Sequence, residues 1–187
     1  MKEKRTQTPF AARLAGHLKT VHEHRRLVRR YCFQCGLYYQ GLVHDLSKYS
    51  PAEFWPSVRY YQGYRTPWDA QREAEGYAPG WIHHRGLNKH HYDYWFDSSK
   101  DGIVPVRMPY RYVIESVCDR VAASRIYNKD KYTPDAPLQY FLTTVGKQAM
   151  HPDTAAQFER ILTMIAEEGE DAVFARIKQS LHDHTEL

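Results

Sequence analysis

Apolar residues recur along most of the chain with the spacing of amphipathic helices, and no stretch alternates apolar and polar residues as a half-buried strand does. Proline and glycine residues divide this pattern into segments. Helices are predicted at about residues 9–35, 37–48, from 51 onward, within 60–80, from 79 through the HHRGLNKHH segment, and at about 110–127, 138–150, 154–168 and 171–182. Residues 97–109 are predicted to form a loop. The expected fold class is therefore all-α.

The best-marked helix boundary lies in the sequence Ser50-Pro51-Ala52-Glu53. Ser50 has the side chain of an N-cap, Pro51 suits the first helical position, and Glu53 stands where a capping box has its acidic residue. We therefore expect a helix to begin at Pro51, with a reciprocal capping box closing its first turn.

Length and composition are those of a globular protein. With 187 residues, 42% hydrophobic and 26% charged, the chain is expected to form a single domain, residues 1–187. No apolar run approaches the roughly 20 residues that span a bilayer, and the N-terminus lacks the apolar segment of a secretory signal. We expect a cytoplasmic protein with no membrane partner. Three cysteines are too few for a disulfide framework, so Cys32 and Cys35 are expected to pack in the core.

Positive charge is concentrated at the N-terminus. The formal net charge is +4, and the first 30 residues carry nine Lys or Arg against two Glu. Such a basic helix suits a phosphate-bearing partner, which would be either a small anionic substrate or a nucleic acid. The alternative is an ordinary solvated helix face.

Eight of the eleven histidines lie in the first half of the chain, and helical geometry separates the three on the first helix. Because successive helical residues turn by about 100°, His17 and His24 fall on the apolar stripe and His22 points among charged residues. We prefer His24 as a metal ligand, because it is closer along the chain to the adjacent pair His44-Asp45. His17 is expected to be a buried core histidine.

The pair in LVHDLSK is the strongest chemical signal. On one helix turn, the imidazole of His44 and the carboxylate of Asp45 can reach the same divalent ion. Farther along, Asp119 emerges from a helix face of small and apolar residues. A buried carboxylate needs a partner, which would be a metal ion or an arginine such as Arg120 or Arg125.

The HHRGLNKHH segment offers four more imidazoles. One continuous helix would place His84 and His91 on its buried stripe and His83 and His90 at the border of that stripe. A break at Gly86 would exchange the roles within each pair.

The order of HRRLV, HDLSK, a central His-rich segment and CDRVAAS resembles the HD-domain superfamily of metal-dependent phosphohydrolases, over about residues 17–126. The whole chain also resembles an uncharacterised family of small bacterial and phage proteins. The first resemblance implies an HD-domain-like helical bundle, with the metal-site core at about residues 9–130. Additional C-terminal helices at about residues 134–184 are expected to cover that core or to form the surface of a homodimer.

The same resemblance implies the ligands. One metal would be held by His24, His44, Asp45 and Asp119. A second metal would take His84 and His91, or their neighbours His83 and His90. The cofactor would be one or two divalent transition metal ions, of Mn, Fe, Co, Ni or Zn.

The leading interpretation of these residues is hydrolysis of a phosphoester on a nucleotide or another small phosphorylated molecule. Asp45 and Lys48 are the predicted catalytic residues: Asp45 would ligate the metal and orient a water molecule, and Lys48 would face the substrate phosphate. Lys89, Arg25 and Arg26 are further substrate-binding candidates.

Two alternatives stay open. Some dinuclear HD proteins that resemble this ligand set are iron oxygenases that cleave C–C or C–P bonds. A non-catalytic nucleic-acid-binding module is the other, in which the basic first helix would contact phosphates and Tyr60, Tyr61 and Tyr64 would stack on bases.

Overall fold

The computed structural model of the protein describes residues 8–100, 102–147 and 149–187. Over these residues the fold is mainly helical, which confirms the expected all-α class. The described residues form nine α-helices: α1 (Phe10–Gln34), α2 (Tyr38–Val43), α3 (Pro51–Tyr60), α4 (Pro67–Glu75), α5 (Pro79–Leu87), α6 (Tyr110–Asn128), α7 (Ala136–Thr144), α8 (Pro152–Glu168) and α9 (Glu170–His182). None of the helices in these ranges is long and apolar enough to cross a membrane.

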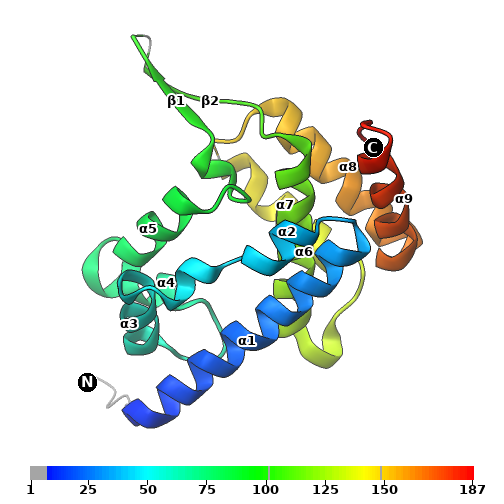
Figure 1. Ribbon diagram of the computed structural model, residues 1–187. Helices are drawn as coiled ribbons and strands as arrows, with labels where there is room; N and C mark the ends of the chain where they lie inside the picture. The colour runs from blue at the N-terminus through cyan, green and yellow to red at the C-terminus, as the bar shows by residue number, and fades with distance from the viewer. Residues whose placement is uncertain (1–7, 101, 148) are drawn as a thin grey trace.

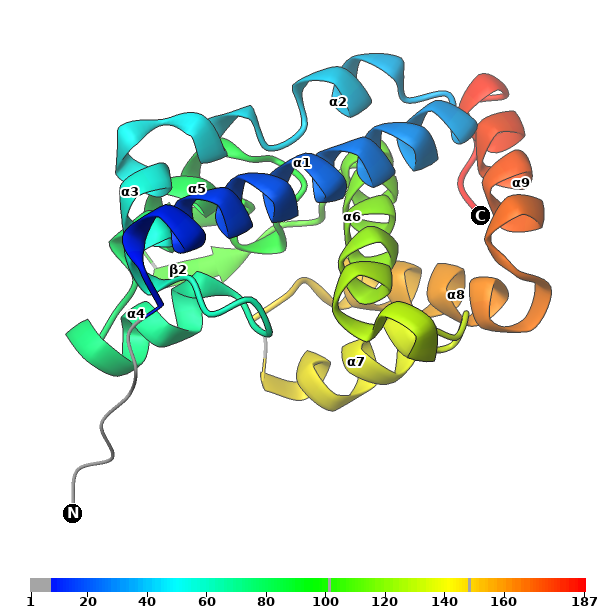
Figure 2. The same ribbon diagram turned by 90° about the horizontal axis from the view of Figure 1, so that it is seen from below.

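The long helices α1 and α6 pack against each other at the centre of the molecule (Figure 1). Figure 2 shows α3, α4 and α5 gathered beside the N-terminal half of α1, with α8 and α9 at the opposite end. The element contacts agree, because α3 and α9 both pack on α1 and α8 packs on α6. Helices α1 and α6 therefore lie between the group of α3, α4 and α5 at one end of the molecule and the pair α8 and α9 at the other.

The hydrophobic core lies at the end that holds α8 and α9. Val28 of α1, Ile114 of α6, Phe158 of α8 and Phe174 of α9 are all fully buried there. Burying one such side chain stabilises a fold by about 1.5–3 kcal/mol. The C-terminal helices α8 and α9 are therefore part of the main hydrophobic core.

The helix expected at residues 37–48 is broken, and that part of the prediction is wrong. Helix α2 ends at Val43, His44 is extended at φ −48° and ψ 127°, and Asp45 has a left-handed backbone at φ 55° and ψ 24°. A 3-10 turn, Leu46–Tyr49, follows. Aspartate tolerates the left-handed region better than most residues do. The His-Asp pair consequently lies on a turn and not on a helix.

The HHRGLNKHH segment is not one helix either. Helix α5 ends at Leu87, and Asn88 is extended at φ −107° and ψ 107°. The Asn88 side chain closes the helix end by donating to the carbonyl oxygen of His84 at 2.7 Å. His90 and His91 therefore approach from a loop, so the helical-stripe argument does not apply to them.

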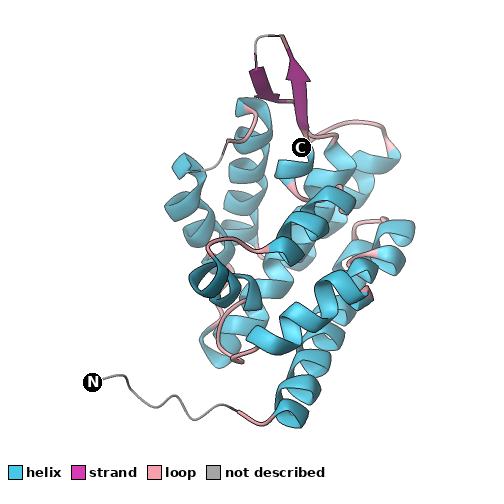
Figure 3. Cartoon of the chain, turned by 90° about the vertical axis from the view of Figure 1, so that its left-hand side faces the viewer, coloured by secondary structure: helices cyan, strands magenta, loops and turns pink. Residues whose placement is uncertain are grey.

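The loop expected at residues 97–109 contains a small hairpin instead. Strand β1 (Phe96–Ser99) pairs antiparallel with strand β2 (Gly102–Pro105), with Phe96 opposite Pro105. The hairpin projects from the helical body (Figure 3). Neither four-residue strand alternates apolar and polar residues, and both are largely exposed, so the sequence carries no strand pattern here.

Candidate metal centre

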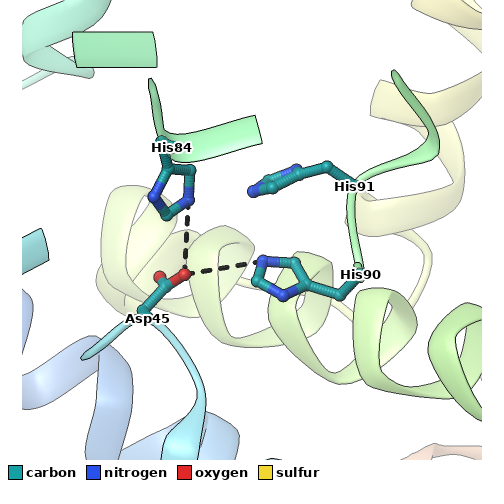
Figure 4. A group of neighbouring side chains, drawn as sticks. All are labelled: Asp45, His84, His90 and His91. Atoms are coloured by element: carbon teal, nitrogen blue, oxygen red, sulfur yellow. Dashed lines mark ion pairs between the residues drawn. The ribbon is translucent and has the colours of Figure 1, made fainter. Parts of the chain in front are cut away.

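Asp45 lies at the centre of a buried cluster of histidines and carboxylates. Its side chain is 1% exposed, and its two oxygens face different neighbours. Oδ2 lies 3.4 Å from Nε2 of both His24 and His44. Oδ1 lies 3.3 Å from Nε2 of His84 and 3.5 Å from Nε2 of His90 (Figure 4). One carboxylate therefore joins two groups of possible ligands.

The first group brings together α1, the turn after α2, and α6. Nε2 of His24 lies 2.9 Å from Oδ1 of Asp119, and Nε2 of His44 lies 3.7 Å from the same oxygen. The potential ligand atoms of His24, His44, Asp45 and Asp119 all lie within 4.8 Å of one another. Such a set of two imidazoles and two carboxylates could hold a divalent metal ion.

The second group lies on the other side of Asp45. Figure 4 shows the imidazoles of His84, His90 and His91 gathered around one oxygen of Asp45. These four residues also place their potential ligand atoms within 4.8 Å of one another. His84 comes from the last part of α5, and the two others come from the loop that follows it.

Two further carboxylates bind the Nδ1 atoms of three of these imidazoles. Oε1 of Glu115, on α6, accepts from Nδ1 of His44 at 2.9 Å and lies 3.2 Å from Nδ1 of His90. Glu53, on α3, accepts from Nδ1 of His84 at 2.7 Å. A carboxylate at Nδ1 keeps the proton on that nitrogen, so that Nε2 is free to ligate a metal.

The carboxyl groups of the site stay ionised. Burial would raise the pKa of Asp45, but His44 and Lys48 outweigh it and lower that pKa well below its usual value. Burial is likewise outweighed at Asp119, whose pKa is lowered by its interactions with the imidazoles of His24 and His44. Imidazole hydrogen bonds also lower the pKa of Glu53 and Glu115. The site therefore holds four carboxylates at neutral pH.

The imidazoles divide into two kinds. Burial lowers the pKa of His90 and, more strongly, that of His91, so both are neutral. Burial acts in the same direction on His44 and His84, but the carboxylate of Asp45 outweighs it and raises the pKa of both rings. A metal ion would replace these protons, because a ligating imidazole must be neutral.

Several buried atoms at the centre of the cluster have no hydrogen-bond partner among the described residues. They are Nε2 of His44, His90 and His91, and Oδ1 of Asp45. Leaving such a buried polar atom unpaired costs about 1–3 kcal/mol. Because these nitrogen and oxygen atoms converge, a divalent transition metal fits their positions and their chemistry.

All six predicted metal ligands lie in the two groups: His24, His44, Asp45, His84, His91 and Asp119. His90 joins them, although the helical argument placed it at the border of the buried stripe. His83 does not, because its Nδ1 binds Oε1 of Glu53 at 2.8 Å and its side chain is 37% exposed. The helical prediction treated His90 and His91 as alternatives. The loop after α5 instead brings both rings into the second group.

The predicted substrate-binding residues are placed differently. Lys48 pairs with Oδ2 of Asp45 at the site. Arg25 instead donates from Nε to the carbonyl oxygen of His44 at 2.8 Å, so it supports the turn. Arg26 and Lys89 are exposed. Of these four, only Lys48 therefore contacts the side chain of a ligand candidate.

Two carboxylates of the site were missed in the sequence. Glu53 was assigned to a capping box, but its side chain is fully buried against histidines, and Ser50 Oγ has no hydrogen-bond partner among the described residues. The helix begins at Pro51 as predicted, but the predicted capping box does not form. Glu115 had one available signal, because it lies one helical turn before Asp119 on the same stripe of α6.

The arginine alternatives for Asp119 do not match the structure. Arg125 pairs with Glu170 at 2.7 Å. The guanidinium of Arg120 lies over the ring of Phe158, 5.0 Å from its centroid. Asp119 faces histidines instead.

Comparison with protein families places the whole site in one matched region. Residues 13–164 match a family described as being of unknown function, DUF5662. The chain belongs to this family. Every residue of the two ligand groups lies inside the region matched to DUF5662, as do Glu53 and Glu115. No match was found among curated proteins or among solved structures. The description of DUF5662 names no reaction.

Proposed function

We propose that the protein is a metal-dependent phosphohydrolase that acts on a nucleotide or another small phosphorylated molecule. The observation that carries this proposal is the position of Asp45, whose two carboxylate oxygens each face a separate group of buried imidazoles. A carboxylate shared in this way suits two metal ions held side by side.

The residues available to the reaction have distinct roles in this proposal. When bound, a divalent Mn, Fe, Co, Ni or Zn ion supplies a nucleophilic hydroxide near neutral pH and polarises a phosphoryl oxygen. Asp45 holds the metal and accepts a hydrogen bond that orients the attacking water. Lys48, whose ammonium group is already paired with Asp45, offsets the negative charge of the substrate phosphate.

Charge balance supports metal binding by this site. Four carboxylates lie within it, and without a metal they are offset by Lys48 and by the protonated imidazoles of His44 and His84. Buried charges need compensation from a partner, a proton or a metal. Two divalent cations would compensate all four carboxylates and leave Lys48 available for an anionic substrate.

The test combines metal loading with a substrate screen. The purified chain is stripped of metal, loaded separately with Mn, Fe, Co, Ni or Zn, and assayed against nucleotides and other phosphoesters. We expect phosphate release that requires metal and falls by at least about 100-fold in Asp45→Asn, because a shared ligand is lost. Arg160→Gln, an exposed change on α8, is the matched control. Equal activity of wild type and Asp45→Asn would refute the proposed hydrolysis.

An iron oxygenase is the second candidate, and the second ligand group is compatible with it. Three imidazoles and one carboxylate suit Fe(II) as well as Zn(II). Metal analysis after anaerobic purification separates the two proposals. Two irons per chain, together with O₂ consumption and no phosphatase activity, would favour the oxygenase.

Nucleic-acid binding is less supported. Tyr61 shares a hydrogen bond of 3.1 Å with Thr20, and the Tyr60 hydroxyl donates to Glu75 at 2.6 Å. Tyr64 is 67% exposed. The guanidinium of Arg65 lies over the Tyr64 ring, 5.8 Å from its centroid, so a base would have to displace Arg65 to stack on that face.

A further inference from the structure

We propose that Glu115 is a positioning residue that couples the two metal positions, because one of its oxygens holds one imidazole of each ligand group. This inference rests on the proposed binding of two metal ions at Asp45. It assigns Glu115 a role that differs from that of Glu53, the other carboxylate behind the histidines.

The contacts of Glu115 cross the boundary between the two groups. Its Oε1 lies 2.9 Å from Nδ1 of His44, in the first group, and 3.2 Å from Nδ1 of His90, in the second. The two imidazole rings are themselves close, with centroids 4.3 Å apart. All three side chains are almost completely buried, so water does not replace these contacts.

A shared acceptor links the orientation of the two rings. Because Glu115 occupies Nδ1 of both, Nε2 of both points to the side where Asp45 lies. Hydrogen bonding to a carboxylate also makes an imidazole a stronger metal ligand. Loss of the Glu115 charge would therefore weaken one ligand of each ion at the same time.

Glu53 provides an internal comparison. Its two oxygens accept from Nδ1 of His83 and Nδ1 of His84, at 2.8 and 2.7 Å. Of these two histidines, only His84 belongs to a ligand group. Loss of the Glu53 charge would therefore weaken the second ion and leave the first unchanged.

A competing interpretation makes Glu115 a metal ligand. His44, His90 and Glu115 could themselves hold an ion, since their potential ligand atoms lie within 4.8 Å of one another. Such an ion would have to displace the Nδ1 protons that make the contacts at 2.9 and 3.2 Å. It would also add a third ion to the two at Asp45, so a count of bound ions separates the two roles.

The experiment measures metal stoichiometry and affinity in the full chain and does not depend on activity. Wild type, Glu115→Gln, Glu53→Gln and Asp119→Asn are titrated with Mn²⁺ and Zn²⁺ by calorimetry, and the bound ions are counted by native mass spectrometry. Circular dichroism of each variant checks its fold. Asp119→Asn marks the first position, because Asp119 belongs to the first group alone.

For wild type we expect two ions per chain. In Glu115→Gln both affinities should fall by about 10- to 100-fold, the usual effect of losing a carboxylate behind a ligating histidine. In Glu53→Gln only one affinity should fall, and it should be the one that Asp119→Asn leaves intact. If Glu115→Gln does not fold, Glu115→Asp can replace it. Aspartate keeps the negative charge on a side chain that is one methylene shorter, so its carboxylate lies farther from both imidazoles and the affinity for both ions should also fall.

Two results would overturn the coupling role. One is a folded Glu115 variant in which either ion keeps its wild-type affinity. The other is a third ion in wild type that disappears in the variant, which would make Glu115 a ligand. A wild-type chain that binds no ion contradicts the proposed function itself, and that outcome is distinct from both.

Discussion

His17 is a buried histidine on α1 that belongs to none of the ligand groups found among the described residues. Its ring packs against those of Phe54 and Tyr61, at centroid distances of 5.5 and 6.2 Å. Burial, with a smaller contribution from the charge of Lys48, lowers the pKa of His17 from 6.5 to about 4. It is the core histidine that the sequence predicted.

This lowered pKa makes His17 a source of acid sensitivity. The unfolded chain takes up a proton at His17 below about pH 6.5, whereas the folded chain resists protonation until about pH 4. The contribution of neutral His17 is therefore complete above pH 6.5 and is lost as the pH falls toward 4. At pH 5 the loss is about 2 kcal/mol.

The change His17→Phe tests this contribution while keeping an aromatic ring in place. Between pH 7.5 and pH 5, wild type should lose about 2 kcal/mol more of its free energy of unfolding than His17→Phe does. Urea denaturation at the two pH values measures the difference. His22→Gln, on the exposed side of the same helix, should behave as wild type. A wild-type pH profile in His17→Phe would contradict the assignment.

Arg25 of α1 supports the backbone of the turn between α2 and α3. Arg25 donates from Nε to the carbonyl oxygen of His44 at 2.8 Å and from Nη2 to that of Leu42 at 3.2 Å. These carbonyls lose their helical partners where α2 ends, and a guanidinium can satisfy two of them at once. Arg25 therefore fixes the backbone that carries two ligand candidates.

Removal of this guanidinium should loosen the turn. Arg25→Met keeps much of the side-chain length but loses both hydrogen bonds, so we expect about 2 kcal/mol lower stability. Metal affinity should fall as well, because His44 and Asp45 lose their support. Thermal melts and metal titration measure the two effects. Arg26→Gln, on the neighbouring exposed position, should change neither, and an equal loss in both variants would exclude a specific role for Arg25.

Most helices could be predicted from apolar periodicity and from Pro and Gly positions, and the start at Pro51 agrees to the residue. The break at His44 and Asp45 could not, because it depends on a left-handed aspartate and on Arg25, which lies 19 positions before His44. The same limit applies to the end of α5 at Leu87. There the Asn88 side chain donates to Ser47 Oγ at 2.8 Å as well as to the carbonyl oxygen of His84, so each break involves a partner from another element that the local sequence does not reveal.

The hydrophobic core and the candidate metal ligands lie in different parts of the molecule. The hydrophobic core joins α1 and α6 to α8 and α9, whereas the ligand groups join α1 and α6 to α5 and the turn before α3. A change deep in the core should therefore lower stability without altering the metal ligands.

Phe174→Ala tests this separation, because Phe174 is fully buried and its ring lies 5.4 Å from that of Tyr31. Large-to-small changes of this kind cost about 3–5 kcal/mol. We expect a lower urea midpoint, but wild-type metal stoichiometry at a temperature where the variant stays folded. Loss of bound metal in the folded variant would show that the two ends are coupled.

Only part of the candidate site could be predicted from the sequence. The order of His24, His44, Asp45 and Asp119 along the chain resembles a known arrangement, and the structure brings these residues together. Glu53 and Glu115 are not part of that order, and an acidic residue on a helix is ordinarily exposed, although Glu115 shares the helical stripe of Asp119. Their function depends on which histidines the fold places beside them.

The left-handed backbone of Asp45 restricts which amino acid can occupy this position. Glutamate offers the same carboxylate on a longer side chain, but a residue without the local hydrogen bonding of aspartate or asparagine pays about 1–2 kcal/mol for that conformation. Asparagine and glycine accept the backbone but provide no negative charge. Aspartate is thus the residue type that satisfies the geometry of the turn and the charge of the cation together, which explains on physical grounds why a shorter acid stands at the point shared by both groups.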